Sequence, residues 1–129
     1  MKSRDTLIRL KRFQVEEKRR RLAQIEMMIS EFTRMATDLD REIGAEEQRT
    51  NNIDPTHFAY STYARAARVR RDNLKTSIGE LRAQVDDAKS ALEDATAELA
   101  KVQNLDGREK GLDARERDLA SQGLRHAQA

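Results

Sequence analysis

The only proline of the chain lies in the break Thr50-Asn51-Asn52-Ile53-Asp54-Pro55, which separates two long apolar repeats. A residue before a proline is pushed out of the helical region, so a helix arriving from the N-terminal side is expected to stop by Asp54. Asp54 can then cap a new helix that has Pro55 at its first position, where no amide hydrogen is needed. The break therefore predicts a helix, a short turn and a second helix that runs back.

The composition favours long helices. Charged residues make up 37% of the 129 residues, against roughly 25% in an average globular protein. One proline, five glycines, no tryptophan and 4% aromatic residues argue against sandwiches, barrels and α/β sheets, which need many turns and bulky strand residues. The fold class that remains is all-α.

Upstream of the break, apolar residues recur every seven positions, which is the pattern of a coiled coil. We call this stripe of core positions the seam. Met28 and Met35 flank it, which suits ordinary edge packing or an adaptable contact with a third element. Lys11 and Lys18 replace apolar residues in it, so the N-terminal end is expected to be looser. The expected core positions are Ile8, Val15, Leu22, Ile29, Ala36 and Ile43, together with Ile25, Phe32 and Leu39.

A matching seam follows the break, with Arg71 in one apolar position. Charge predicts how the two repeats pair. Residues 1–21 carry nine basic and three acidic side chains and would lie along the acidic residues 86–106. The basic residues 54–75 would lie along the acidic residues 32–53. The expected core positions of the second repeat are Ile78, Val85, Leu92 and Leu99, together with Leu74, Leu81, Ala88, Ala95 and Val102.

These patterns predict a long antiparallel two-helix coiled-coil hairpin over residues 1–106, followed by a C-terminal extension over residues 107–129. The first helix is expected over about residues 4–51, the turn over about 52–54 and the second helix over about 55–106. The extension has no partner in its own chain by this pairing, so it is expected to be partly helical or frayed. Its leucines, one per seven residues, make too thin a stripe to fold alone. They are Leu112 and Leu119, and Leu105 precedes the extension with the same spacing.

Just after the break, residues 57–71 interleave aromatic and basic side chains. Such a cluster can stack nucleic-acid bases, form a hot spot for a protein partner, or close the end of the hairpin core. A nucleic-acid-binding arm would project its arginines into solvent without partners. Those arginines are Arg65, Arg68, Arg70 and Arg71.

No motif for catalysis or for cofactor binding occurs in the sequence, and His57 has no neighbouring ligand with which to hold a metal. No cysteine is present, and no apolar run approaches the length of a membrane span or of a signal-peptide core. We therefore expect a cytoplasmic protein with no catalytic site, no cofactor and no metal.

Two stretches resemble the FliJ family of flagellar export proteins. The first is Met1-Lys2-Ser3-Arg4-Asp5-Thr6-Leu7-Ile8-Arg9-Leu10-Lys11-Arg12-Phe13-Gln14-Val15-Glu16-Glu17-Lys18-Arg19-Arg20, with Gln24-Ile25-Glu26-Met27-Met28-Ile29 after it. The second, from His57-Phe58-Ala59-Tyr60 to Arg65-Ala66-Ala67, is similar to the alphaproteobacterial branch. The likeness covers roughly residues 1–100 and is one of overall pattern.

The resemblance implies a non-enzymatic, stalk-like coiled coil of the flagellar type III export apparatus, held at the cytoplasmic face of the inner membrane through its partners. Those partners would be the export ATPase ring, the cytoplasmic domain of the export gate, and export chaperones. Tyr60, Tyr63 and Ala67 would be candidates for contacting the gate. The candidates for the ATPase ring are Leu105, Leu112, Leu119, Arg9 and Arg12.

Two other hypotheses remain at this point. One is the nucleic-acid-binding helical arm, whose affinity would fall steeply as salt rises. The other is a generic coiled-coil scaffold that dimerises through its seam.

Overall fold

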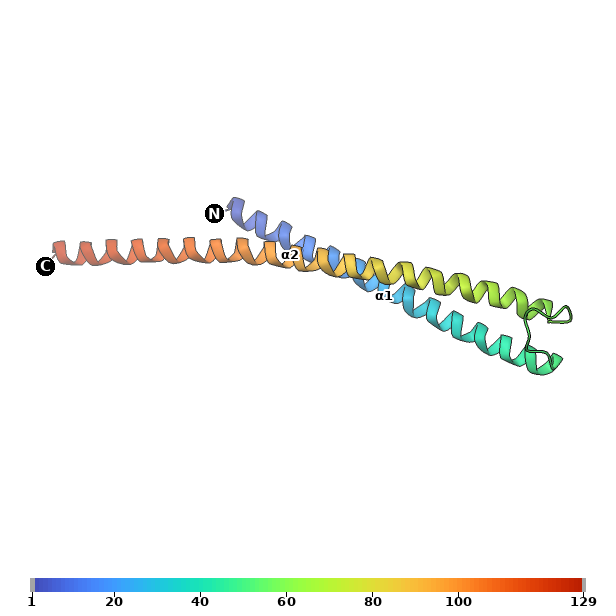
Figure 1. Cartoon of the computed structure of the whole chain (residues 1–129). Helices are drawn as coiled ribbons and strands as arrows, with labels where there is room; N and C mark the ends of the chain where they lie inside the picture. Colours follow the sequence, from blue (N-terminus) through green and yellow to red (C-terminus); the bar gives the residue numbers. More distant parts are fainter. Residues whose placement is uncertain (1, 129) are drawn as a thin grey trace. The chain divides into compact units, whose positions relative to one another are not determined.

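A computed structural model describes residues 2–128 of the chain and the side chains of residues 3–123. It contains two helices, α1 (Lys2–Thr50) and α2 (Thr62–Gln128), joined by a loop (Figure 1). The chain forms two compact units. The terminal unit comprises Met1–Arg19 and Ser90–Ala129, and the loop unit comprises Arg20–Lys89. Within each unit α1 packs against α2 in the opposite direction, which confirms the predicted all-α two-helix hairpin.

The core of the loop unit follows the predicted seam. Ile25 is 2% exposed and Ala64 is fully buried, so the two helices approach closely on both sides of this unit's centre. Counting back from Leu74 in steps of seven residues gives Ala67 and Tyr60, and both are buried. The other predicted positions of this unit are buried or half-buried, namely Leu22, Ile29, Phe32, Ala36, Leu39, Ile43, Leu74, Ile78, Leu81, Val85 and Ala88.

The terminal unit has a thinner seam. Ile8, Val15 and Ala95 are buried, and Leu92, Leu99 and Val102 are half-buried. Two seam positions are basic, as predicted: Lys11 is half-buried and Lys18 is exposed. The seam ends at Asp106, seven residues after Leu99. Asp106 is buried, and its carboxylate pairs with Lys110 at 3.0 Å. Fewer apolar contacts therefore hold this unit together.

Opposite charges meet across the helices, as the charge blocks predicted. In the terminal unit, Arg4 pairs with Glu109 at 2.6 Å and Lys11 pairs with Glu98 at 2.8 Å. In the loop unit, the guanidinium of Arg71 lies 3.0 Å from the Asp40 carboxylate. Arg71, which sits in an apolar seam position, thus reaches a carboxylate at the edge of the seam. These pairs contribute little free energy each, but they fix orientation and register.

The predicted boundaries of the turn are wrong. The loop runs over residues 51–61, and α2 begins at Thr62 instead of Pro55. Asp54 does accept hydrogen bonds from the amide and hydroxyl of Thr56, at 3.0 and 2.7 Å. They close only a single turn, in which the amide of His57 donates to the carbonyl of Asp54. An Asp-Pro pair serves a tight turn as well as a helix start, because both need the φ angle that proline fixes.

Residues outside that turn end α1 and begin α2. Asn51 adopts a positive φ of 52°, and the amides of Asn51 and Asn52 donate to the carbonyls of Gln48 and Glu47. This is a Schellman termination with asparagine in the left-handed position. The side chain of Ser61 accepts the amide hydrogen of Ala64 at 3.2 Å and therefore caps α2.

The predicted C-terminal extension continues α2 as a helix to Gln128. Every residue from 107 to 123 is exposed. The prediction that this stretch has no partner in its own chain is wrong at its start, where Glu109 pairs with Arg4. Met1 and Ala129, the first and last residues of the predicted hairpin and extension, lie outside the described residues. None of the described helices is both long and apolar enough to span a bilayer.

Candidate functional site

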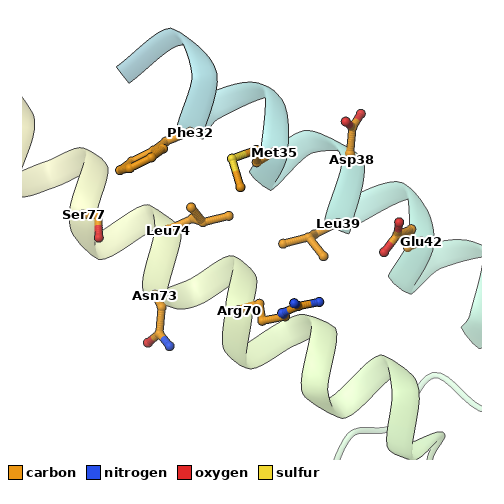
Figure 2. Close-up of a pocket in the computed structure, with 9 residues that line it drawn as sticks. All are labelled: Phe32, Met35, Asp38, Leu39, Glu42, Arg70, Asn73, Leu74 and Ser77. Atoms are coloured by element: carbon orange, nitrogen blue, oxygen red, sulfur yellow. The ribbon is translucent and has the colours of Figure 1, made fainter. Parts of the chain in front are cut away.

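An open groove runs along one side of the loop unit. Its floor is apolar and consists of Phe32, Met35 and Leu39 from α1 and Leu74 from α2, which point toward one another in Figure 2. The volume of the groove is about 500 Å³. Its rim is polar and is formed by Asp38, Glu42, Arg70, Asn73 and Ser77. An apolar floor with a polar rim is typical of a surface on which a helix docks.

The opposite side of the loop unit is closed by charge. Asp40 and Glu47 lie on the side of α1 away from Met35, as their helical spacing requires. Asp40 pairs with Arg71 at 3.0 Å, and Glu47 pairs with Arg68 at 4.0 Å. About half of Met35 is exposed on the groove side, so apolar surface remains accessible there.

The predicted gate residues divide into one accessible residue and two core residues. Tyr63 is exposed, and its hydroxyl donates to the Glu42 carboxylate at 3.0 Å. That hydrogen bond raises the pKa of the Tyr63 phenol. Tyr60 and Ala67 are buried between the helices, so they cannot contact a partner directly while the hairpin stays folded. Of the three residues, only Tyr63 remains available as a direct contact.

The arginines after the break do not form the unpaired cluster that a nucleic-acid arm requires. Arg65 donates to the carbonyl of Pro55 at 3.0 Å and lies 5.5 Å from the centre of the Tyr60 ring. Arg68 and Arg71 pair with carboxylates of α1. Arg70 lines the groove. Arg68 and Arg71 thus bridge the two helices, and Arg65 contacts the loop.

A carboxylate at the end of α1 ties the loop to both helices. Glu46 accepts hydrogen bonds from Arg49 at 2.6 Å and from the hydroxyl of Ser61 at 2.8 Å. These contacts, that of Arg49 first, lower the pKa of Glu46 from 4.5 to about 2. Ser61 caps α2, so the charged carboxylate positions the start of that helix.

The loop also carries an exposed apolar pair that the sequence patterns did not predict. Phe58 is 94% exposed and stacks on His57 with 4.7 Å between ring centres. Ile53 is 76% exposed. Ile53 lies within the break and Phe58 just after it, and neither belongs to the predicted core positions of the two repeats.

The predicted ATPase-ring residues all lie in the terminal unit and are exposed. Leu105, Leu112 and Leu119 are more than half exposed, and Arg9 and Arg12 are exposed on α1. Each leucine precedes by one residue a position of the α2 seam, so this leucine stripe points beside the seam and away from the core. The spacing of seven residues keeps the three leucines on one side of the helix.

The described residues bring together no cluster of metal-ligating side chains. Among residues 2–128, no group of three or more His, Asp or Glu side chains is placed to hold a metal ion. The groups whose pKa shifts are surface carboxylates, cations and a phenol held by ion pairs and hydrogen bonds, such as Glu98 beside Lys11. What the surface offers is apolar side chains for contact with other helices.

No protein-family model, no curated protein and no solved structure matches this chain.

Proposed function

We propose that this protein is a non-enzymatic, stalk-like component of the flagellar type III export apparatus. The resemblance of residues 1–29 and 57–67 to the FliJ family supports the proposal, and so does the antiparallel pairing of two long helices. In the cell it would act in the cytoplasm, held at the inner face of the membrane by its partners.

The observation that carries the proposal is the exposed leucine stripe of the terminal unit. Leu112 and Leu119 project from a part of α2 that no residue of the described chain covers. Exposed leucines spaced by seven residues gain free energy only when another surface buries them. The export ATPase ring is the partner proposed for this surface, with Arg9 and Arg12 as accompanying basic contacts.

The loop unit would serve the export gate and the export chaperones. Tyr63 is the accessible member of the proposed gate contacts, and the groove beside it offers an apolar floor for a partner helix. Tyr60 and Ala67 would contribute by shaping the loop unit from inside. This division gives the two units different partners.

The partners of Arg65, Arg68 and Arg71 weigh against a nucleic-acid arm, since those side chains are already engaged. The seam is filled within each unit, which weighs against a scaffold that dimerises through it. Protein binding at exposed surfaces is the function that these contacts favour.

Co-purification of the full chain with the export ATPase and with the cytoplasmic domain of the gate tests the proposal. We expect both to be captured, Leu112→Asp with Leu119→Asp to lose the ATPase, and Tyr63→Ala to weaken the gate. Val69→Asp is the matched control, because Val69 is equally exposed but lies in the loop unit. Failure of the unaltered chain to capture either protein would refute the export function.

A further inference from the structure

Two apolar surfaces of the described chain have no cover, and their apolar residues share one spacing. One is the groove of the loop unit, floored by Phe32, Met35, Leu39 and Leu74. The other is the leucine stripe of the terminal unit, Leu105, Leu112 and Leu119. In both, the apolar residues repeat every seven positions along a helix, as Phe32 and Leu39 do in the groove. Equal repeats let successive side chains of one surface fit between those of the other.

The α1 rim of the groove is acidic. Asp38 lines the groove, and Glu31 lies seven residues before it on the same side of α1. Both side chains are exposed. The contact of Asp38 with Arg41 is long, at 3.7 Å, and lies at the surface, so most of its charge stays available to a partner.

One flank of the leucine stripe is basic with the same spacing. Arg108 and Arg115 lie three residues after Leu105 and Leu112, so they border the stripe on one side. Glu109 and Glu116 border it on the other side. Arg108 and Arg115 are exposed and seven residues apart, as Asp38 and Glu31 are.

We propose that the leucine stripe of one copy docks into the groove of a second copy. The inserted helix runs antiparallel to α1 of the receiving copy. Because helices are right-handed, only this direction turns the arginine flank toward α1. Arg108 then faces Asp38 and Arg115 faces Glu31, while Leu112 enters the groove between Phe32 and Met35.

Antiparallel pairing of two leucine stripes with each other is less favourable. In an antiparallel pair the same flank of each helix meets, which sets Arg108 beside the Arg115 of the other copy and Glu109 beside its Glu116. Like charges in such positions are repulsive. The groove instead offers charges of opposite sign to the arginine flank, and so specifies its occupant.

The proposed contact joins two different surfaces. Each copy offers one stripe and one groove, so association is expected to rise with concentration and to form either a closed dimer or longer chains. The rim pairs are exposed, so association weakens as the salt concentration increases. The same leucines would be unavailable to another protein while they are docked.

A cross-linking experiment tests the pairing, because the chain contains no cysteine. Full chains carrying only Met35→Cys are mixed with full chains carrying only Leu112→Cys and are oxidised. We expect the mixed disulfide to form at least about tenfold faster than with Thr33→Cys in place of Met35→Cys, because docking raises the effective concentration of the two sulfurs. Thr33 is exposed on a different side of α1 and is the matched control.

Charge reversal provides an independent test by sedimentation velocity. Arg115→Glu and Glu31→Arg should each reduce association of the full chain severalfold, and both together in one chain should restore it. Circular dichroism of each variant checks that the helices remain folded. Restoration would not follow if either substitution merely disturbed its own helix.

Three results would overturn the proposal. The first is an unaltered chain that remains monomeric at about 100 μM in low salt, where surface electrostatic attraction is strongest. The second is Leu112→Cys alone cross-linking as fast as the mixed pair, since that would place stripe against stripe. The third is an unrestored double charge reversal. None of these results depends on the export proposal, because no export protein is present in these experiments.

Discussion

The loop unit and the terminal unit pack the same two helices with different residues. Between α1 and α2 the loop unit has Ile25, Ile43 and Ile78, all buried. Equivalent positions of the terminal unit include Lys11 and Asp106. Apolar burial is the main source of folding free energy, so most of the stability is expected in the loop unit. The terminal unit, with weaker packing of its own, leaves a regular row of leucines exposed along α2.

The largest expected effect on this difference comes from truncating the best-buried side chain. Ile25→Ala should lower the free energy of unfolding by about 3 kcal/mol, since it removes buried methylenes and leaves a cavity. Ile8→Ala should cost about half as much, because Ile8 is less buried and the helix end can relax. Urea unfolding followed by circular dichroism measures both. Equal losses would mean that the two units are equally well packed.

The termination of α1 provides the next effect. Asn51 has a positive φ, which costs a residue with a β-carbon about 1–2 kcal/mol unless its side chain eases the strain, as that of asparagine does. Asn51→Ala should therefore destabilise the loop unit by about 1 kcal/mol, whereas Asn51→Gly should not. Thermal unfolding of the two variants, compared with the unaltered chain, distinguishes them. Equal melting temperatures for both would show that the left-handed turn is not maintained in solution.

Substituting helical glycines should distinguish the two units by an effect of similar size and opposite sign. A β-carbon at Gly44 or Gly111 would meet nothing within 4 Å. Gly44→Ala should raise the unfolding free energy by about 1 kcal/mol, the difference in helix propensity. Gly111→Ala should instead increase the helical signal without moving the urea midpoint, because residues 107–123 are exposed and do not contribute to the core. A shift of the midpoint with Gly111→Ala would place this part of α2 within the cooperative core.

Acid provides the smallest effect, and it acts on the loop unit. The pKa of Glu46 is lowered to about 2, so its contribution is fully present above its ordinary pKa of 4.5 and is lost as the pH falls toward 2. Glu46→Gln should flatten the pH dependence of stability in that window. Glu98→Gln, in the terminal unit, is the companion variant, because Lys11 also lowers the pKa of Glu98. Thermal unfolding between pH 2 and 5 compares the two. An unchanged pH profile for Glu46→Gln would show that the contacts of the charged Glu46 with Arg49 and Ser61 contribute nothing to stability.

Much of the fold could be predicted because coiled-coil packing is periodic. Each predicted core position lies between the helices, since a side chain that recurs every seven residues stays on one side of a helix. The loop boundary could not be predicted in the same way. Asp54-Pro55 fits both a helix start and a tight turn. In the structure it forms a tight turn, and α2 begins after Ser61, whose hydroxyl caps it. Tyr60 and Ala67 were interpreted as surface contacts, although counting back from Leu74 by sevens predicts that they are buried.

The candidate surfaces were predicted less completely. The leucines of the terminal unit were recognised by their spacing, and Met28 and Met35 were recognised as flanking the seam. The groove itself depends on which flank remains open. Which flank stays open depends on the charges of both helices, since Arg68 and Arg71 of α2 pair with carboxylates of α1 on the opposite side. A pattern read along one helix contains no such information about the other.

The hairpin topology also orders events during synthesis. Residues 20–50 leave the ribosome without a partner, and they gain one as soon as residues 62–89 follow, because the intervening loop is short to close. The loop unit is therefore expected to form first. Residues 2–19 are made before residues 20–50, yet their partners begin at Ser90. The basic first turns of α1 thus wait longest for their acidic partners, and during translation they are the segment most open to chaperones and to premature contacts.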